Sequence, residues 1–279
     1  MRTFLLLLLV ASSALAVTPE VHRDLFYTDA KDKLQSLDVY APPDGKDHPV
    51  VVWIHGGGWK KGDKAGMQQK PQAFTDKGCV LVSINYRFIP DVTLKDMMGD
   101  VAKAIRWVHD HAREYRGNPD SIVVMGHSAG AHLAALICTD DRYLKAEGVS
   151  FASLRGCVPI DVSVYDLTKR LQDGGSVAPT TYTAIFGQTE AEHREFSPVT
   201  HIAKDKHIPP FLFLHVASRD DTKAQSHWLA AKLKEAGGAA TVIAGEGKTH
   251  GTISTDLGGT DDPPTLEVWK FLQKVAPQP

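Results

Sequence analysis

Ile122-Val123-Val124-Met125-Gly126-His127-Ser128-Ala129-Gly130 is followed directly by an Ala- and Leu-rich segment that ends at Cys138. The first four residues form an apolar run too short for a helix, which predicts a buried strand, and residues 129–138 predict a helix. Between the two lies a Gly-x-Ser-x-Gly pentapeptide, whose small residues permit a sharp turn that presents a serine hydroxyl above a sheet. Because the motif stands between a strand and a helix, we interpret Ser128 as a nucleophile and not as a chance glycine-flanked helix start.

Apolar runs of strand length recur along the rest of the chain, each bounded by turn residues. They cover residues 50–54, 80–84, 211–214 and 240–243. Such runs predict buried strands of a mainly parallel sheet. Two shorter β-prone stretches at residues 21–27 and 35–40 precede them and predict an antiparallel opening of the sheet.

Helical patterns lie between these runs, at residues 95–115 and 222–236 as well as after Ser128. Strands that alternate with helices predict an α/β fold: a mostly parallel, doubly wound sheet with helices on both faces. Residues 161–197 break the alternation and contain Gly174-Gly175 and Pro179. We expect a short insertion above the sheet there.

The composition narrows the classes of partner. The chain has 279 residues, of which 43% are hydrophobic and 23% charged, so it can bury a sizeable core. Its formal net charge of -2 provides no field that would gather nucleic acid or an anionic membrane. The three cysteines, Cys79, Cys138 and Cys157, show no C-x-x-C spacing, which argues against a zinc site. One bridge with a free thiol and three buried thiols both remain open.

The N-terminus has the order of an export signal. Arg2 precedes the apolar run Phe4 to Val10, and Ala14-Leu15-Ala16 has the small-x-small form of a cleavage site. A membrane anchor is the competing interpretation, but a spanning helix needs about 20 apolar residues. We therefore predict a signal peptide at residues 1–16, a single domain at 17–279, no integral anchor, and a secreted or periplasmic protein.

A second glycine-rich signal is independent of the pentapeptide. His55-Gly56-Gly57-Gly58-Trp59 directly follows the strand expected at residues 50–54. Backbone N–H groups of such a loop can approach a developing oxyanion closely, because no Cβ intervenes. We predict an oxyanion hole formed by the amides of Gly57, Gly58 and Ala129. Trp59 is a candidate to line the substrate pocket, although an aromatic residue after a glycine turn is as often packing.

His55 to Trp59, Asn85-Tyr86-Arg87 and Gly126 to Gly130, in this order, resemble the α/β-hydrolase superfamily. The resemblance is closest to its esterase/lipase branch, which includes hormone-sensitive-lipase-like carboxylesterases, feruloyl and acetyl esterases and kynurenine formamidases. It covers the chain from about Leu25 to Leu272 and implies serine hydrolysis without a metal or organic cofactor.

The resemblance also orders the remaining triad residues as nucleophile, acid, base. Of the histidines, His250 lies in a loop after the strand at 240–243, where this family carries its base, whereas His227 falls inside a predicted helix. Relatives with an Arg-x-Asp segment favour Asp221 as the acid. Asp220 is its neighbour and alternative, and Asp161, at the end of the strand-like stretch 157–160, is a third candidate.

The function expected from these residues is serine carboxylic-ester hydrolysis through an acyl-enzyme. A short insertion should leave the site open, which suits short-acyl esters or acetyl and feruloyl groups carried on a polysaccharide. Lipase and arylformamidase activities are the alternatives among hydrolases. A non-catalytic binding protein on a hydrolase scaffold is the alternative of another class.

Overall fold

The computed structural model of the chain describes residues 18–174 and 179–278, so the signal peptide predicted at residues 1–16 lies outside the described residues. Alternate side chains of its central strands enter two separate cores. Val50 and Val52 belong to one hydrophobic cluster, whereas Val51 and Trp53 belong to the other. Because side chains of a strand point to opposite faces in turn, this sheet is apolar on both faces and needs helices on each.

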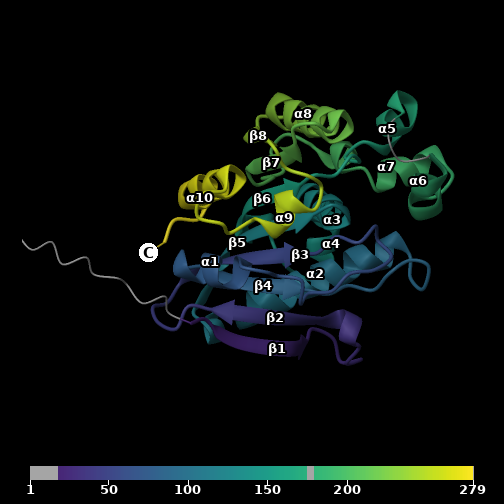
Figure 1. Cartoon of the computed structure of the whole chain (residues 1–279). Helices are drawn as coiled ribbons and strands as arrows, with labels where there is room; N and C mark the ends of the chain where they lie inside the picture. The colour runs from purple at the N-terminus through teal and green to yellow at the C-terminus, as the bar shows by residue number, and fades with distance from the viewer. Residues whose placement is uncertain (1–17, 175–178, 279) are drawn as a thin grey trace, which may run out of the picture.

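The strands form one eight-stranded sheet in the order β1-β2-β4-β3-β5-β6-β7-β8. Its members are β1 (Glu20–Phe26), β2 (Ser36–Ala41), β3 (His48–Ile54), β4 (Val80–Ile84), β5 (Gly117–His127), β6 (Leu154–Ile160), β7 (Phe211–Val216) and β8 (Ala240–Gly245). The β1–β2 and β2–β4 pairs are antiparallel, and every other pair is parallel. The predicted antiparallel opening and parallel body of the sheet are confirmed (Figure 1).

Helices cover both faces. Those on one face are α2 (Leu94–His111), α3 (Ala129–Thr139) and α8 (Asp220–Glu235), whose buried side chains join the first cluster. Those on the other are α1 (Lys70–Asp76), α9 (Thr252–Thr255) and α10 (Pro263–Val275), which pack on the second cluster. The helix α4 (Asp141–Ala146) follows α3, and short 3-10 helices occupy Lys33–Gln35, Ala112–Tyr115, Phe151–Ser153 and Pro198–His201. The predicted α/β-hydrolase fold is confirmed.

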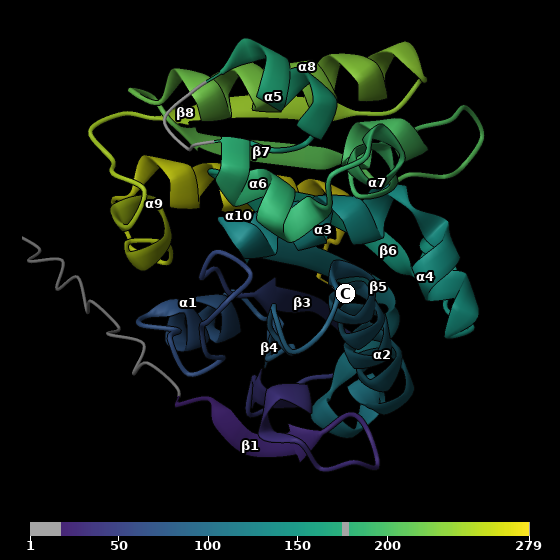
Figure 2. The same cartoon turned by 90° about the vertical axis from the view of Figure 1, so that its right-hand side faces the viewer.

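The predicted insertion is also present. Between β6 and β7 the described residues form three short α-helices, α5 (Leu167–Asp173), α6 (Pro179–Phe186) and α7 (Glu190–Glu195). Figure 2 shows them on the side of the sheet where the parallel strands end. Since functional loops of such sheets gather at the carboxyl ends of the strands, the insertion stands at the edge where a site is expected.

One strand begins earlier than the apolar run alone predicts. β5 starts at Gly117 and not at Ile122, because Gly117 pairs with His48 ahead of a register shift. Residues 117–121 were not predicted as part of the strand because Asn118-Pro119-Asp120 is a sequence typical of turns. Within the described part of the chain, none of the helices is long and apolar enough to cross a membrane.

Candidate active site

Ser128 stands at the sharp turn between β5 and α3, as predicted. Its backbone has φ 55° and ψ -122°, a region that non-glycine residues rarely occupy. Strain of this kind costs about 1–3 kcal/mol and persists only where the surroundings enforce it. Here the Ser128 amide donates to the Ile160 carbonyl oxygen at 2.9 Å, which ties the turn to the end of β6.

Two glycines allow the turn to sit against the neighbouring strand end. A Cβ on Gly130 would lie 2.1 Å from the carbonyl oxygen of Ile54, so no larger residue fits there. A Cβ on Gly56 would lie 3.0 Å from the Cβ of Ser128. The glycine loop that begins at Gly56 is therefore packed directly beside the serine, and the two sequence motifs meet in space.

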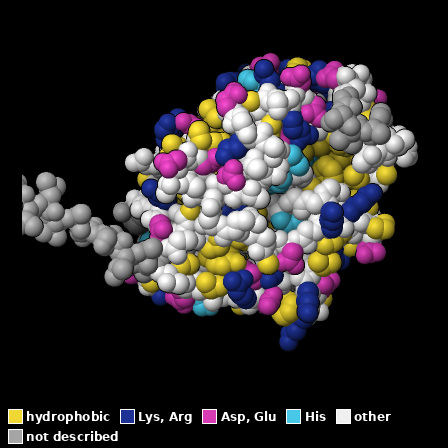
Figure 3. Space-filling view, viewed as in Figure 1, with side chains coloured by type: hydrophobic (Ala, Val, Ile, Leu, Met, Phe, Trp, Pro, Cys, Tyr) yellow, Lys and Arg dark blue, Asp and Glu magenta, His cyan; other side chains and the backbone are white. Residues whose placement is uncertain are grey.

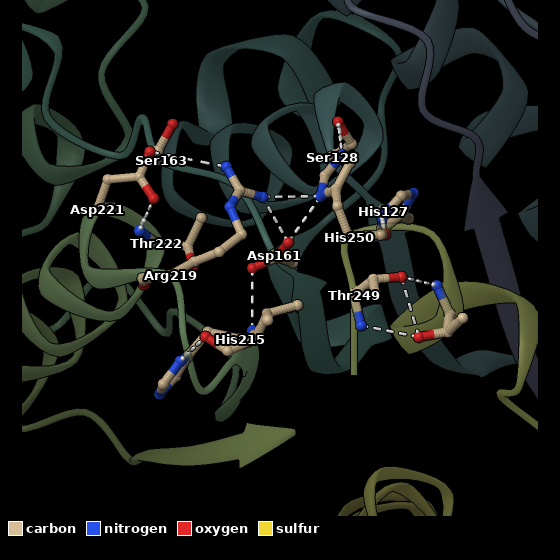
Figure 4. A network of polar contacts seen from close by, with 12 residues as sticks. His127, Ser128, Asp161, Ser163, His215, Arg219, Asp221, Thr222, Thr249 and His250 are labelled. Atoms are coloured by element: carbon tan, nitrogen blue, oxygen red, sulfur yellow. Dashed lines mark hydrogen bonds and ion pairs between the residues drawn. The ribbon is translucent and has the colours of Figure 1, made fainter. Parts of the chain in front are cut away.

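His250 reaches Ser128 from the loop after β8. Its Nε2 lies 3.0 Å from the Ser128 Oγ, and its Nδ1 lies 2.6 Å from the Oδ2 of Asp161 (Figure 4). An ionised carboxylate only accepts, so Nδ1–H donates to Asp161 and leaves Nε2 free to accept from the serine hydroxyl. The side chain of His250 is 45% exposed.

Asp161 is buried at the carboxyl end of β6, and β-sheet register brings it to this position. His127 pairs with Ile160 across β5 and β6, so the next residue of each strand, Ser128 and Asp161, leaves the sheet side by side. The Asp161 carboxylate also accepts from the Val216 amide at 3.0 Å. Burial by itself raises the pKa of Asp161, but hydrogen bonds from His250, Val216 and Thr222, together with the charge of Arg219, hold this pKa well below its usual value.

The preference for Asp221 over Asp161 as the partner of His250 does not agree with this geometry. Asp221 is the second residue of α8, and its Oδ2 lies 3.6 Å from Arg219 Nη2 and 3.7 Å from Arg170 Nη2. The start of the helix turns Asp221 toward these two arginines. Asp220, the other alternative in that loop, is exposed at the first position of α8. The third candidate, Asp161, is the one at hydrogen-bond distance from the imidazole.

His127, to which we assign no proton-transfer role, contacts the loop that carries His250, the predicted base. Its Nε2 donates to the main-chain oxygen of His250 at 2.7 Å, and the two rings lie 4.5 Å apart between centroids. Burial, and after it the neighbouring His250, lowers the pKa of His127 to about 4. The His127 ring is thus neutral near neutral pH and acts as a hydrogen-bond donor. Sequence reasoning missed this contact, because it joins residues 123 positions apart.

The rest of the His250 loop is fixed by short-range contacts on both sides. Thr249 and Thr252 exchange backbone-to-hydroxyl hydrogen bonds of 2.8 and 3.1 Å at the start of α9. Lys248 forms ion pairs with Asp256 at 2.9 Å and with Asp262 at 2.5 Å. These contacts limit the positions that the imidazole can adopt.

Of the residues predicted to form the oxyanion hole, Ala129 follows Ser128 in the chain, and Gly57 and Gly58 follow Gly56, whose Cα packs against the serine. Gly57 and Gly58 have φ values of 130° and 63°, which favour glycine. Within residues 18–174 and 179–278, no protein acceptor pairs with the amides of Gly57, Gly58 or Ala129. These three amides therefore have no protein acceptor among the described residues, a property expected of oxyanion-hole donors.

Trp59, the last residue of the glycine-rich stretch 55–59, is buried and does not lie on the surface. It is only 6% exposed and packs its ring edge-to-face on His132 and on Phe186 of α6, at centroid distances of 5.6 and 5.1 Å. Trp59 therefore couples the glycine loop to the insertion. Figure 3 shows histidine side chains at the surface in a depression on this face, beside hydrophobic side chains.

Arg219 is a second contact that sequence reasoning missed. Its Nη1 lies 2.6 Å from Oδ2 of Asp161 and 2.8 Å from Nδ1 of His250. One sequence signal pointed to it: Arg219 is the single cation in the loop Ser218-Arg219-Asp220-Asp221, from which the acid was sought.

The described residues include no group of three or more His, Cys, Asp or Glu side chains placed to hold a metal ion. Cys79, Cys138 and Cys157 are all buried, free thiols. Of the two possibilities that the sequence left open, the structure therefore has three buried thiols and not one disulfide with a free thiol.

Comparison with known proteins places the chain in a family. The BD-FAE family model matches residues 37–233. A probable isoprenylcysteine alpha-carbonyl methylesterase, ICMEL1 of Arabidopsis thaliana, is 34% identical over 86% of this chain and 52% of its own length. The probable carboxylic ester hydrolase LipM of Mycobacterium tuberculosis is 36% identical over 64% of this chain and 44% of its own length.

The chain thus spans about half the length of these curated relatives. Among solved structures, a truncated carbohydrate esterase from gut microbiota superposes with a TM-score of 0.77 at 22% identity, over 95% of this chain and 99% of the other. That likeness supports the fold. Given the extent of the family match, the chain belongs to the BD-FAE family, within the esterase/lipase branch of the α/β-hydrolases.

Proposed function

We propose that this protein is a serine carboxylic-ester hydrolase whose triad is Ser128, His250 and Asp161. The observation that carries the proposal is the continuous chain of contacts from Oγ through Nε2 and Nδ1 to Oδ2, at 3.0 and 2.6 Å. A nucleophile, a base and an orienting carboxylate in this order are what acyl transfer requires. Relatives named as carboxylic ester hydrolases and methylesterases support the same reaction class.

In the proposed mechanism, the Ser128 hydroxyl attacks the ester carbonyl while His250 takes its proton at Nε2. The imidazolium that forms is stabilised by ionised Asp161, which also fixes the tautomer. The amides of Gly57, Gly58 and Ala129 donate to the oxyanion of the tetrahedral intermediate. His250 then protonates the leaving alcohol, and the acyl group remains on Ser128.

Deacylation repeats these steps with water. His250 removes a proton from the water as its oxygen attacks the acyl carbonyl, and the same amides hold the second oxyanion. Collapse of this intermediate returns the proton to Ser128 and releases the carboxylic acid.

For the substrate we propose short-acyl esters, either soluble or carried on a polysaccharide as acetyl or feruloyl groups. The half-exposed side chain of His250 and the three short helices of the insertion support an open site. A methylesterase among the relatives is consistent with a small leaving alcohol.

A fluorophosphonate probe tests the nucleophile directly. We expect covalent labelling of the folded protein on Ser128, loss of labelling in Ser128→Ala, and full labelling in Ser218→Ala, a matched control in an exposed loop. A panel of acetyl xylan, methyl ferulate, triglyceride and N-formylkynurenine then separates the substrate classes. Absence of both labelling and turnover would favour a non-catalytic binding protein.

We also propose that residues 1–16 are an export signal, on the strength of the basic, apolar and small-residue segments in the sequence. N-terminal sequencing of protein recovered from the periplasm or medium should begin at Val17. Recovery of the intact N-terminus in the cytosolic fraction would contradict export.

A further inference from the structure

Arg219 contacts both the carboxylate and the imidazole of the proposed triad. Its Nη1 donates to Oδ2 of Asp161 at 2.6 Å, the same oxygen that accepts from His250. The 2.8 Å between Nη1 and Nδ1 of His250 joins two donors, because Nδ1 carries the proton that Asp161 accepts. Arg219 thus places a positive charge directly against the imidazole, in the short contact that Figure 4 draws between the two side chains.

The guanidinium is fixed from its other side as well. Arg219 precedes α8, and its amide closes a turn onto the Val216 carbonyl oxygen at 3.1 Å. Its Nη2 lies 3.6 Å from Asp221, which in turn lies 3.7 Å from Arg170 of α5. With 26% of its side chain exposed, Arg219 is held between two carboxylates at the edge of the site.

The charges around His250 come from each element packed against it. Asp161 faces it from the end of β6, His127 from the end of β5 and Arg219 from the loop after β7. His127 is neutral near neutral pH because burial lowers its pKa to about 4. Asp161 thus brings a negative charge and Arg219 a positive charge against the same ring, and the two act on it in opposite senses.

We propose that Arg219 is a positioning residue of this hydrolase, which orients Asp161 toward His250 and sets the pH above which His250 acts as a base. The inference rests on the proposed function, since it assigns a role within the same triad. Without Arg219, the uncompensated Asp161 would stabilise the imidazolium more strongly, and His250 would lose its proton only at higher pH.

The test is the pH profile of kcat/KM for a p-nitrophenyl ester in wild type, Arg219→Gln and Arg219→Lys. Arg219→Gln removes a positive charge that lies 2.8 Å from the imidazole but is partly exposed to solvent. Its acidic limb should therefore lie about one pH unit higher than that of wild type. Arg219→Lys keeps the charge and should restore the limb to within about 0.3 unit of wild type. Asp220→Asn, a matched change in the same loop, should leave the limb in place.

The proposal would be overturned if the acidic limb of the kcat/KM profile stayed at the same pH in Arg219→Gln and only the maximal kcat/KM or the Tm fell. Arg219 would then be a structural residue. If Arg219→Gln does not fold, Asp221→Asn decides. This variant keeps Arg219 but removes a carboxylate 3.6 Å from it, so the positive charge of Arg219 is less compensated and the acidic limb must move to lower pH. An acidic limb that stays at the wild-type pH in Asp221→Asn rejects the inference. Failure of the proposed function would instead appear as wild-type turnover that survives Ser128→Ala.

Discussion

Asp161 Oδ2 lies 2.6 Å from His250 Nδ1, although the two residues are 89 positions apart in the chain. The contact exists because β6 lies beside β5, so that the residue after Ile160 emerges next to Ser128. The carboxylate is buried, and its other contacts come from the Val216 amide, Arg219 and Thr222. The contact with His250 is the observation that favours Asp161 over Asp221 as the acid of the proposed triad.

The first prediction compares these two aspartates. Asp161→Asn should lower kcat by about 10³–10⁴-fold, because an amide cannot stabilise the imidazolium and favours the wrong tautomer. Asp221→Asn should stay within about tenfold of wild type, since that carboxylate faces Arg219 and Arg170 and not the imidazole. Both are measured as kcat on p-nitrophenyl acetate at about pH 8, where a histidine base is neutral.

Asp220→Asn serves as the surface control for this pair and should match wild type. Thermal unfolding must show that Asp161→Asn is folded before its rate is interpreted. A large loss in Asp221→Asn with an active Asp161→Asn would reassign the acid to α8.

The sequence was sufficient for the parts of the site that local patterns encode. Ser128 could be predicted because an apolar run, a small-residue turn and an Ala-rich helix are contiguous, and the glycine loop at residues 55–59 because it ends a strand. The acid could not be chosen in this way. Asp161 and Asp221 both follow strands, and only the register of β5 against β6 places one of them beside the serine.

Contacts that join distant segments of the chain could likewise not be predicted from the sequence. His127 meets the main chain of His250, and Arg219 meets Asp161, through the packing of loops from different strands. Charged groups buried in the core, such as Lys70, leave no periodic signal at all, because a single lysine at a helix start usually lies at the surface.

The second prediction concerns the hydrogen bond from His127 to the main-chain oxygen of His250. His127→Leu removes the donor to the His250 carbonyl and should lower kcat by about tenfold to a hundredfold, since small displacements of a base are costly. His127→Gln keeps an N–H donor of comparable reach and should recover most of the loss. Because its pKa is lowered to about 4, His127 is neutral during turnover, so the acidic limb of the pH profile should stay in place in both variants.

Burst kinetics with a p-nitrophenyl ester locate the effect. If the base is displaced, acylation and deacylation slow together, since His250 serves both. Wild-type turnover in His127→Leu would show that the 2.7 Å contact is not needed to hold the loop.

The third prediction is a dependence of stability on pH. Lys70 is fully buried, with Nζ 4.8 Å from the Trp53 ring centroid, and burial lowers its pKa from 10.5 to about 8. At neutral pH the folded protein must therefore keep a charged ammonium in a buried site, where Nζ donates to the side-chain oxygen of Gln68 at 3.2 Å. Lys70→Met should raise the free energy of unfolding at pH 7, by up to about 3 kcal/mol if the full shift applies.

The sign follows from proton binding. Between the folded pKa of about 8 and the unfolded value of 10.5, the unfolded chain binds more protons than the folded one, so wild type gains stability as pH rises. The advantage of Lys70→Met should thus shrink across this window, as measured by urea unfolding. Lys77→Met, on an exposed residue just after α1, is the matched control; an advantage that is constant with pH would contradict a charged Lys70.

The fourth prediction concerns acyl length. Trp59, His132 and Phe186 fill the space between the glycine loop and α6, with centroid distances of 5.0 to 5.6 Å. His132 lies one turn into α3 from the nucleophile, and its amide donates to the Ser128 carbonyl oxygen at 3.2 Å. This aromatic cluster should limit the acyl pocket, so kcat/KM should be higher for p-nitrophenyl acetate and butyrate than for the palmitate. Faster cleavage of the palmitate would reject the short-acyl assignment and favour a lipase.

A cavity variant tests whether the cluster itself sets this limit. Phe186→Leu removes ring volume beside Trp59 and should raise the ratio of hexanoate to acetate turnover by about threefold to tenfold, the range expected for one or two methylenes in an apolar pocket. Phe26→Leu, at an exposed position of β1, should leave the ratio unchanged. Because the ratio compares two substrates in one protein, a lower stability of Phe186→Leu cancels from it. An unchanged ratio in Phe186→Leu would show that the acyl group does not bind against this cluster.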